Sequence, residues 1–244
     1  MKITVIGAGA IGGNLAVTLG AAGHDVQIAD ALGVEAIRPE LLTSGARAVA
    51  LADSVAGRDV VILSIPYDRV PELAQLLTTA PADAVVVDTS NYYPHLNGVM
   101  DGVDEAQSET GRNAELIGRP LVKAWNAALA GTQQTKGLPA GTPGRIAIPV
   151  AADSEAARRV VMQLVDDTGF DPYDTGILAD SWRQQPMGPA YCTELTLDEI
   201  GAAVARADRT KDLHARSTLG ERFTALGESP TVDEVVELNR AAHR

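Results

Sequence analysis

The stretch "VIGAGAIGG", residues 5–13, decides the fold, because three of its glycines have the spacing G-x-G-x-x-G. It follows a short apolar run and opens a helical pattern. In this context Gly7 permits a tight turn, Gly9 lets the backbone approach a pyrophosphate, and Gly12 lets the helix pack on the strand. The start of the helix also supplies N–H groups and partial positive charge. The motif therefore predicts a bound dinucleotide, NAD or NADP.

The rest of the first two-thirds of the chain alternates short apolar runs with helical patterns, which we expect at residues 10–22, near Val34 and at residues 70–79. The runs "DVQIA", "DVVILSI", "AVVVD" and "RPLVKAW" are continuously apolar, as in parallel strands buried on both faces. We expect a doubly wound, mostly parallel α/β sheet of the Rossmann type. The acidic stretch at residues 95–115 is longer than an ordinary connection, so it is either a flexible lid or a region with a helix inside.

From Ser181 onward the pattern becomes helical and increasingly charged. We therefore predict two parts, a dinucleotide-binding Rossmann domain over residues 1–176 and a smaller, mainly helical segment over 177–244. The helical segment would form a wall of the substrate pocket, a dimer contact, or both. Its apolar positions need a partner surface on the first domain or on a second chain. These positions are Leu195, Leu197, Ile200, Val204, Leu213, Leu219 and Leu226.

Composition excludes several classes of function. The formal net charge of −12 disfavours nucleic acid and anionic membrane surfaces. No run reaches the ~18 apolar residues of a membrane span, and Met1 leads directly into the first strand, so we expect a cytoplasmic chain. The single cysteine, Cys192, cannot form an internal disulfide, and the four histidines are scattered, which predicts no metal site. The expected partner is a small molecule.

Asp30 ends the second predicted strand, about twenty residues beyond the glycine loop. A carboxylate there can accept hydrogen bonds from the adenosine ribose, which favours NAD over NADP. A 2'-phosphate beside Asp30 would meet like charge, although Arg38 could pair with it. Asp30 could instead cap the following helix.

Aromatic residues are scarce, yet Tyr67, Tyr92, Tyr93 and Trp125 each come just after a predicted strand. Ligands of doubly wound sheets bind at the carboxyl ends of the strands. We therefore expect these rings to hold the nicotinamide against a second flat redox partner, with Tyr67 as a wall of the nicotinamide end. The alternative is that each ring packs a loop onto the sheet.

Together the stretches "IGAGAIGGNLA", "DVVILSIPYDRV", "VVVDTSNYYP", "LVKAWNAA", "GRIAIPVAADS" and "DSWRQQPMGPAYC" resemble the deazaflavin (coenzyme F420)-dependent NADP oxidoreductase family, from Met1 to about Cys192. The resemblance implies hydride transfer and a homodimer. Members that use NADP usually carry a Ser-Arg pair after the second strand, where this chain has Ala31 and Leu32 behind Asp30. The resemblance also implies a nicotinamide end lined by Ser64, Ile65, Pro66, Thr89, Ser90, Asn91, Asn126 and Ala127.

The chemistry depends on the acceptor. A flavin or deazaflavin needs only stacking against the nicotinamide, because the cofactors carry the chemistry. A small carbonyl or imine needs a proton donor, for which Lys123, Tyr92 and His95 are candidates, with Asn126 orienting the carboxamide. A third hypothesis is a redox sensor that binds NAD(P) without turnover.

The stretch "DSWRQQPMGPAYC", residues 180–192, is predicted to form the far wall of the substrate pocket or an interface. Cys192 has no basic neighbours or helix start that would make it a reactive thiol. The predicted catalytic residues are Lys123 and Asn126. The predicted substrate pocket consists of Tyr92, Tyr93, Trp125, Trp182 and Tyr191. The predicted cofactor site consists of Gly7, Gly9, Ala10, Ile11, Gly12, Asp30, Ser64, Ile65, Pro66, Tyr67, Val70, Thr89, Ser90, Asn91, Asn126 and Ala127.

Overall fold

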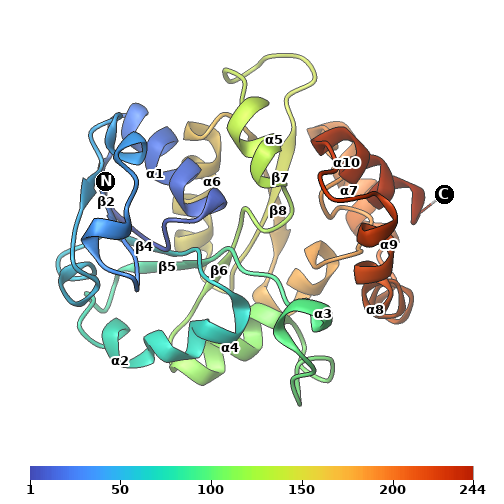
Figure 1. The fold of residues 1–244 in the computed structure, drawn as a ribbon, viewed down its shortest axis with the longest axis horizontal. Coiled ribbons are helices and arrows are strands. Elements are labelled where there is room, and N and C mark those ends of the chain that lie inside the picture. The colour runs from blue at the N-terminus through green and yellow to red at the C-terminus, as the bar shows by residue number, and fades with distance from the viewer. Residues whose placement is uncertain (244) are drawn as a thin grey trace.

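A computed structural model describes residues 1–243. Its strands form one eight-stranded sheet in the order β3-β2-β1-β4-β5-β6-β7-β8 (Figure 1). Neighbouring strands run parallel except at β6 and β7, where Lys123 pairs antiparallel with Ala151. The predicted mostly parallel Rossmann sheet is therefore confirmed. The strands are β1 (Lys2–Ile6), β2 (Asp25–Ala29), β3 (Arg47–Ala48), β4 (Val60–Leu63), β5 (Val85–Asp88), β6 (Val122–Lys123), β7 (Ala147–Ala151) and β8 (Asp171–Gly176).

Both faces of the sheet are covered, which is why its strands are continuously apolar. Along β4, Val60 and Ile62 face one core, and Val61 and Leu63 face the other. The first core is closed by α1 (Ala10–Ala21) and α6 (Glu155–Asp167), and the second by α2 (Ala74–Leu77) and α4 (Glu109–Ile117). Figure 1 shows these pairs of helices on opposite sides of the central strands.

Two of the stretches expected to be helical, near Val34 and at residues 70–79, form short 3-10 turns instead. The chain after β4 was expected to be helical over residues 70–79, but it forms η4 (Tyr67–Leu73) before α2. Pro71 lies inside η4 and has no N–H to donate, which disfavours a continuous α-helix. The other short turns are η1 (Val34–Ala36), η2 (Pro39–Leu42), η3 (Leu51–Asp53) and η5 (Leu178–Gln184).

The long acidic connection contains helices. It forms α3 (Pro94–Asn97) and then leads into α4, which begins after Ser108 and ends at the left-handed Gly118. The Ser108 hydroxyl accepts from the Gly111 N–H and caps α4. Of the two alternatives for this stretch, the region with a helix inside is the one observed. A further short helix, α5 (Ala130–Thr135), follows β6.

The C-terminal part is helical, as predicted, and lies beyond β7 and β8 in Figure 1. Its helices are α7 (Leu197–Arg206), α8 (Arg209–Ser217), α9 (Leu219–Ala225) and α10 (Val232–Ala241). Ile200, Val204 and Leu219 are buried, whereas Leu197 is exposed. The predicted boundary at residue 176 coincides with the end of β8, and the division into domains stays a prediction. Across residues 1–243, none of the helices has the length and apolarity to cross a membrane.

Candidate active site

The glycine loop joins β1 to α1, and each glycine has its own physical role. A Cβ on Gly7, whose φ is +108°, would lie 2.1 Å from the Ser64 carbonyl oxygen. A Cβ on Gly12 would lie 2.0 Å from the Gly7 carbonyl oxygen. A Cβ on Gly9 would meet nothing within 4 Å. Gly7 and Gly12 are thus required by protein packing, whereas Gly9 borders open space.

The start of α1 is arranged for an anion. Gly9 is the N-cap residue, no side chain caps the helix, and the first turn carries no acidic residue. Ala10 is exposed at the helix start, and Ile11 is partly buried against the core. The first N–H groups of a helix lack intrahelical acceptors and carry partial positive charge, so this end can hold a phosphate.

A pocket of about 580 Å³ opens beside the glycine loop. Asp30 lies in its wall, where Oδ2 accepts from the Ala8 N–H at 2.9 Å and Oδ1 accepts from the Leu32 N–H at 3.0 Å. The carboxylate therefore ties the end of β2 to the glycine loop and keeps lone pairs for further donors. The lining residues are Ile6, Gly7, Gly9, Asp30, Ala31, Leu51, Ser64, Ile65, Pro66, Arg69, Glu72 and Leu73.

The arginine in this pocket is not the one that the sequence suggested. Arg38 does not line the pocket, and its Nη1 lies 3.5 Å from Glu40 Oε1. Arg69 of η4 lines the pocket and donates to Glu72 at 2.7 Å. Sequence reasoning missed Arg69, although it stands only two residues beyond the strand-end tyrosine. Val70, a predicted cofactor contact, is fully buried in the core instead.

Tyr67 and Tyr92 do not form an open wall. Both are buried, with ring centroids 5.6 Å apart, in a small cluster with Val103. The Tyr67 hydroxyl donates to the Glu109 carbonyl oxygen at 3.1 Å, and burial raises the Tyr67 pKa. The Tyr92 hydroxyl donates to the Gly98 carbonyl oxygen at 3.0 Å. The expectation that these two rings contact the ligands is therefore corrected: they pack the connection to α4 onto the strand ends.

Trp125 was predicted to line the substrate pocket, but it lies in the core. It is 1% exposed and belongs to the core between the sheet and α6. Its φ is 57°, a left-handed conformation unusual for a bulky residue. The indole N–H donates to Thr168 Oγ1 at 3.3 Å, and the Trp125 carbonyl oxygen accepts from Gln133 Nε2 at 3.0 Å. These contacts hold Trp125 in the core.

Lys123 is enclosed where β5 and β6 end. Its side chain is 0% exposed, its Nζ donates to the Ser90 carbonyl oxygen, and Asp88 Oδ2 lies 3.8 Å away. Asp88 in turn accepts from Ser90 Oγ at 2.6 Å and from Thr110 Oγ1 at 2.7 Å. The Lys123 ammonium is thus held in a buried network and does not line the glycine-loop pocket, and its catalytic role stays a prediction.

A second buried charge network lies next to Lys123. Glu109 is 1% exposed, and its carboxylate accepts from Arg216 Nη1 at 2.8 Å and from the Tyr92 N–H at 3.1 Å. Burial raises the Glu109 pKa, and the charges of Lys123 and Arg216 oppose that rise. Arg216 also contacts Asp104 and lies over the Tyr92 ring. Arg216 therefore joins α8 to the strand ends, a role that its position in a charged tail did not reveal.

The Asn126 side chain is 3% exposed and is held by hydrogen bonds within the protein. Its Nδ2 donates to Asn91 Oδ1 at 3.0 Å and to the Gln184 carbonyl oxygen at 2.7 Å. Its Oδ1 accepts from Gln184 Nε2 at 3.1 Å. Asn126 thus joins the segment after β5 to η5, and its orienting role stays a prediction. Among the other predicted nicotinamide contacts, Ser90 and Ala127 are each 6% exposed, and Thr89 is 7% exposed.

Tyr93 and Tyr191, two residues of the predicted substrate pocket, lie in contact with each other. Their hydroxyl oxygens are in contact, and Asn91 Nδ2 lies 3.4 Å from the Tyr191 oxygen. Burial raises the pKa of both tyrosines, so both phenols are neutral. Burial also raises the pKa of the Cys192 thiol to about 12. The thiol is therefore protonated at neutral pH, in keeping with its predicted lack of reactivity.

The two remaining candidates lie at the margins. Trp182 is half-buried in η5, with the Arg183 guanidinium 4.4 Å from its ring centroid. His95 is exposed, and its imidazole lies near the Tyr93 ring and Gly220 of α9. His95 is thus separated from the glycine-loop pocket, whose lining it does not share.

Comparisons with known proteins agree with this geometry. Residues 2–92 match the family model described as NADP oxidoreductase, coenzyme F420-dependent. Protein YjhV of Escherichia coli strain K12 is 35% identical over 142 residues, which cover 58% of this chain and 96% of YjhV. The match to YjhV covers nearly all of that protein.

Solved structures give the same result. The hypothetical protein SMa0349 from Sinorhizobium meliloti superposes with a TM-score of 0.63 and 30% identity, over 74% of this chain and 87% of that one. A candidate F420-dependent NADP reductase from Arthrobacter sp. FB24 superposes with a TM-score of 0.58 and 25% identity, over 75% of this chain and 87% of that one. The chain therefore belongs to the coenzyme F420-dependent NADP oxidoreductase family and is an NAD(P)-dependent oxidoreductase.

Proposed function

We propose that the protein transfers a hydride between NAD(P) and a flat acceptor of the flavin or deazaflavin type, with coenzyme F420 as the model. One observation carries the proposal: none of the three predicted proton donors is available in the glycine-loop pocket. Lys123 Nζ donates to the Ser90 carbonyl oxygen, the Tyr92 hydroxyl donates to the Gly98 carbonyl oxygen, and His95 lies outside that pocket. A flavin-like acceptor needs only a site that stacks it on the nicotinamide.

The proposed cofactor pose follows the pocket. The pyrophosphate would lie over Gly9 and the start of α1, and the adenosine would lie beside Asp30. The nicotinamide would reach past Ser64 and Ile65 toward Ser90 and the Ala127 backbone. NAD is the preferred form in this proposal, because Asp30 can accept from both ribose hydroxyls and would repel a 2'-phosphate.

Steady-state oxidation of NADH and NADPH tests the proposal. The acceptors are a coenzyme F420-type deazaflavin, a free flavin, and a panel of small ketones and cyclic imines. We expect turnover with a ring acceptor and little with the ketones and imines. Imine or ketone turnover without deazaflavin or flavin turnover would overturn the proposal, and cofactor binding with no turnover at all would favour the sensor.

A second candidate function is reduction of a small carbonyl or imine, and the pair of neutral phenols at Tyr93 and Tyr191 favours it. A neutral phenol can donate a proton to the reacting atom. Replacing Tyr191 with Phe removes one hydroxyl and keeps the ring. If the phenol pair is the proton donor, this variant loses about 100-fold in kcat with an imine. With a deazaflavin as acceptor we expect a change of less than about threefold.

We also propose that the protein is a homodimer. An apolar groove of about 580 Å³ lies on the C-terminal helices, lined by Leu226, Leu238, Ala241 and Ala242 among others. Such a surface is suited to a second chain. Light scattering of the purified protein tests this proposal, because the mass of a single chain would contradict it.

A further inference from the structure

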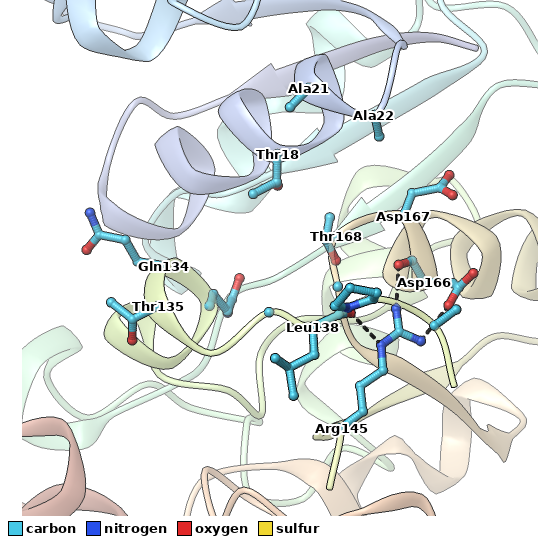
Figure 2. Close-up of a pocket in the computed structure, with 15 residues that line it drawn as sticks. Thr18, Ala21, Ala22, Gln134, Thr135, Leu138, Arg145, Asp166, Asp167 and Thr168 are labelled. Carbon is cyan, nitrogen blue, oxygen red and sulfur yellow. Dashed lines mark hydrogen bonds and ion pairs between the residues drawn. The ribbon is translucent and has the colours of Figure 1, made fainter. Parts of the chain in front are cut away.

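Arg69 and Arg145 each line a pocket, but their side chains are held very differently. Arg145 lines a pocket of about 480 Å³ between α1, α5 and α6, where it lies beside Asp166 (Figure 2). Its side chain is 3% exposed, and its Nη1 lies 2.6 Å from Asp166 Oδ1 and 2.7 Å from Asp171 Oδ1. In the glycine-loop pocket, the Arg69 side chain is 61% exposed. Of the two guanidinium groups, the one on Arg69 is therefore accessible to a ligand.

The carboxylates beside Arg69 hold the edge of its guanidinium. Its Nη1 donates to Glu72 Oε1 at 2.7 Å, and its Nε lies 3.7 Å from Asp68 Oδ2. Asp68 is fixed in turn, because its Oδ1 accepts from Asn97 Nδ2 at 2.7 Å. The N–H groups of a guanidinium lie in its plane, so these contacts use the edge of the group and not its two faces.

The rest of this pocket is suited to a flat, largely apolar group. Arg69 shares the lining with the aliphatic side chains of Leu51, Ile65, Pro66 and Leu73. Within residues 1–243, none of the lining residues is aromatic. A planar base bound there would therefore find its stacking partner in the Arg69 guanidinium, which stacks on aromatic rings and attracts their π-electrons.

The charges around Arg69 favour a neutral ring over a second phosphate. Glu72 and Asp68 compensate the guanidinium, and Asp30 adds a carboxylate to the same pocket. A 2'-phosphate would have to displace Glu72 from Arg69 and would meet the negative charge of Asp30. An uncharged ring avoids this repulsion and contacts the faces of the guanidinium, which the carboxylates leave free.

We propose that Arg69 recognises the adenine of the dinucleotide by stacking on the base, and that Glu72 is a positioning residue that holds the guanidinium in place. The inference rests on the proposed cofactor pose, in which the adenosine ribose lies beside Asp30. It assigns the choice of base to Arg69, whereas Asp30 selects the ribose. It does not depend on the identity of the hydride acceptor.

The test is titration of the full chain with NADH, NADPH and reduced nicotinamide cytosine dinucleotide, followed by fluorescence of the reduced nicotinamide. The cytosine analogue keeps both riboses, the pyrophosphate and the nicotinamide, and replaces the purine with a smaller ring. Wild type should bind NADH about fivefold more tightly than this analogue. Arg69→Ala should weaken NADH and NADPH by the same factor, about fivefold, and should reduce the preference for adenine to less than about twofold.

Arg159→Ala is the matched control, because Arg159 is also an exposed arginine paired with a glutamate, Glu155, but lies on α6 outside this pocket. Its affinities should equal those of wild type. An unchanged NADH affinity in Arg69→Ala, a loss confined to NADPH, or a preference for adenine that survives the substitution overturns the inference. These titrations use no hydride acceptor, so an inactive acceptor panel leaves the inference standing. Failure of wild type to bind NADH would overturn the cofactor pose and this inference together.

Two further variants separate the plane of the guanidinium from its charge. Arg69→Lys keeps the charge without the plane and should bind NADH as weakly as Arg69→Ala, within about twofold. Full recovery of NADH affinity in Arg69→Lys would overturn the stacking. Glu72→Ala should weaken NADH about threefold when Arg69 is present and should have no effect in the Arg69→Ala background. Equal losses in both backgrounds would overturn the positioning role of Glu72.

Discussion

The glycine-loop pocket and the ends of β5 and β6 lie at the carboxyl ends of strands of the same sheet, but their polar groups are satisfied in opposite ways. At the glycine loop, the first turn of α1 has no capping side chain, and Gly9 faces open space. At the ends of β5 and β6, Lys123 and Asn126 give their donors to protein oxygens. Both regions looked like ligand sites in the sequence.

The contrast distinguishes a binding surface from the part of the protein that supports it. Buried polar groups must be hydrogen-bonded, so charges that satisfy one another hold elements in place. Groups that await a ligand are left uncapped at a surface, as at the start of α1. The β5 and β6 ends therefore act as a frame that fixes the crevice, and we propose that the glycine loop is the part that binds the cofactor.

The largest effect should follow from Lys123→Met. The change leaves Asp88 without its buried cation, and breaking a buried pair costs about 3–5 kcal/mol. We expect the free energy of unfolding to fall by this amount in urea denaturation. A variant with unchanged stability and an abolished rate would instead make Lys123 catalytic and would remove the distinction between the two regions.

Two glycine substitutions distinguish protein packing from cofactor binding within the loop itself. Gly12→Ala would put a Cβ 2.0 Å from a carbonyl oxygen, and overpacking of this kind costs about 1–3 kcal/mol of stability. Gly9→Ala meets no protein atom, so stability should hold while NADH affinity falls about tenfold. Thermal unfolding and cofactor titration of the pair separate the two roles. Equal loss of stability in both variants would contradict them.

The selector for the cofactor should have a somewhat smaller effect. Wild type is expected to bind NADH about tenfold more tightly than NADPH, a difference of ~1.4 kcal/mol. Asp30→Ser combined with Leu32→Arg should reverse the order, because the guanidinium can pair with the 2'-phosphate. Titration by fluorescence of the reduced nicotinamide measures both affinities, with Leu32→Arg alone as control. If wild type already prefers NADPH, Arg69 is the first residue to replace.

The smallest predicted effect lies outside both regions, at Asp212 of α8. Burial raises its pKa from 3.8 to about 6, and its Oδ2 has no partner within residues 1–243. A carboxyl whose folded pKa is raised favours the folded state only while protonated, so its contribution is lost as pH rises from about 4 to 6. Asp212→Asn should gain about 1 kcal/mol relative to wild type across that window. The free energies of unfolding of wild type and Asp212→Asn are measured by urea denaturation at about pH 4 and about pH 6. If the difference between the two proteins is the same at both pH values, this assignment is wrong.

Much of the fold could be predicted from the sequence, because periodicity reports burial. The continuous apolar runs of β1, β4 and β5 gave a sheet covered on both faces, and G-x-G-x-x-G gave the first turn. The 3-10 turns were missed because their helical pattern resembles that of an α-helix, although Pro71 was a visible warning. In η4 a single missing N–H disfavours the α-helix, and a count of apolar positions does not register it.

The candidate site was predicted less well, because a strand-end position does not determine the direction of a side chain. Tyr67, Trp125 and Asn126 come just after strands, as ligand contacts do, yet each turns inward to a partner far along the chain: Glu109, Thr168 and Gln184, respectively. Such partners are set by tertiary packing. The glycine loop was placed well because its chemistry is local in sequence.

The most direct test of the central claim is isotope transfer. NADH deuterated at the reactive nicotinamide carbon is mixed with the enzyme and a coenzyme F420-type deazaflavin, and the reduced product is examined by mass spectrometry. Direct hydride transfer predicts deuterium in the reduced deazaflavin, with the same yield in wild type and in Tyr191→Phe. Unlabelled deazaflavin product, or label found only in an imine product and dependent on the Tyr191 hydroxyl, would contradict the account.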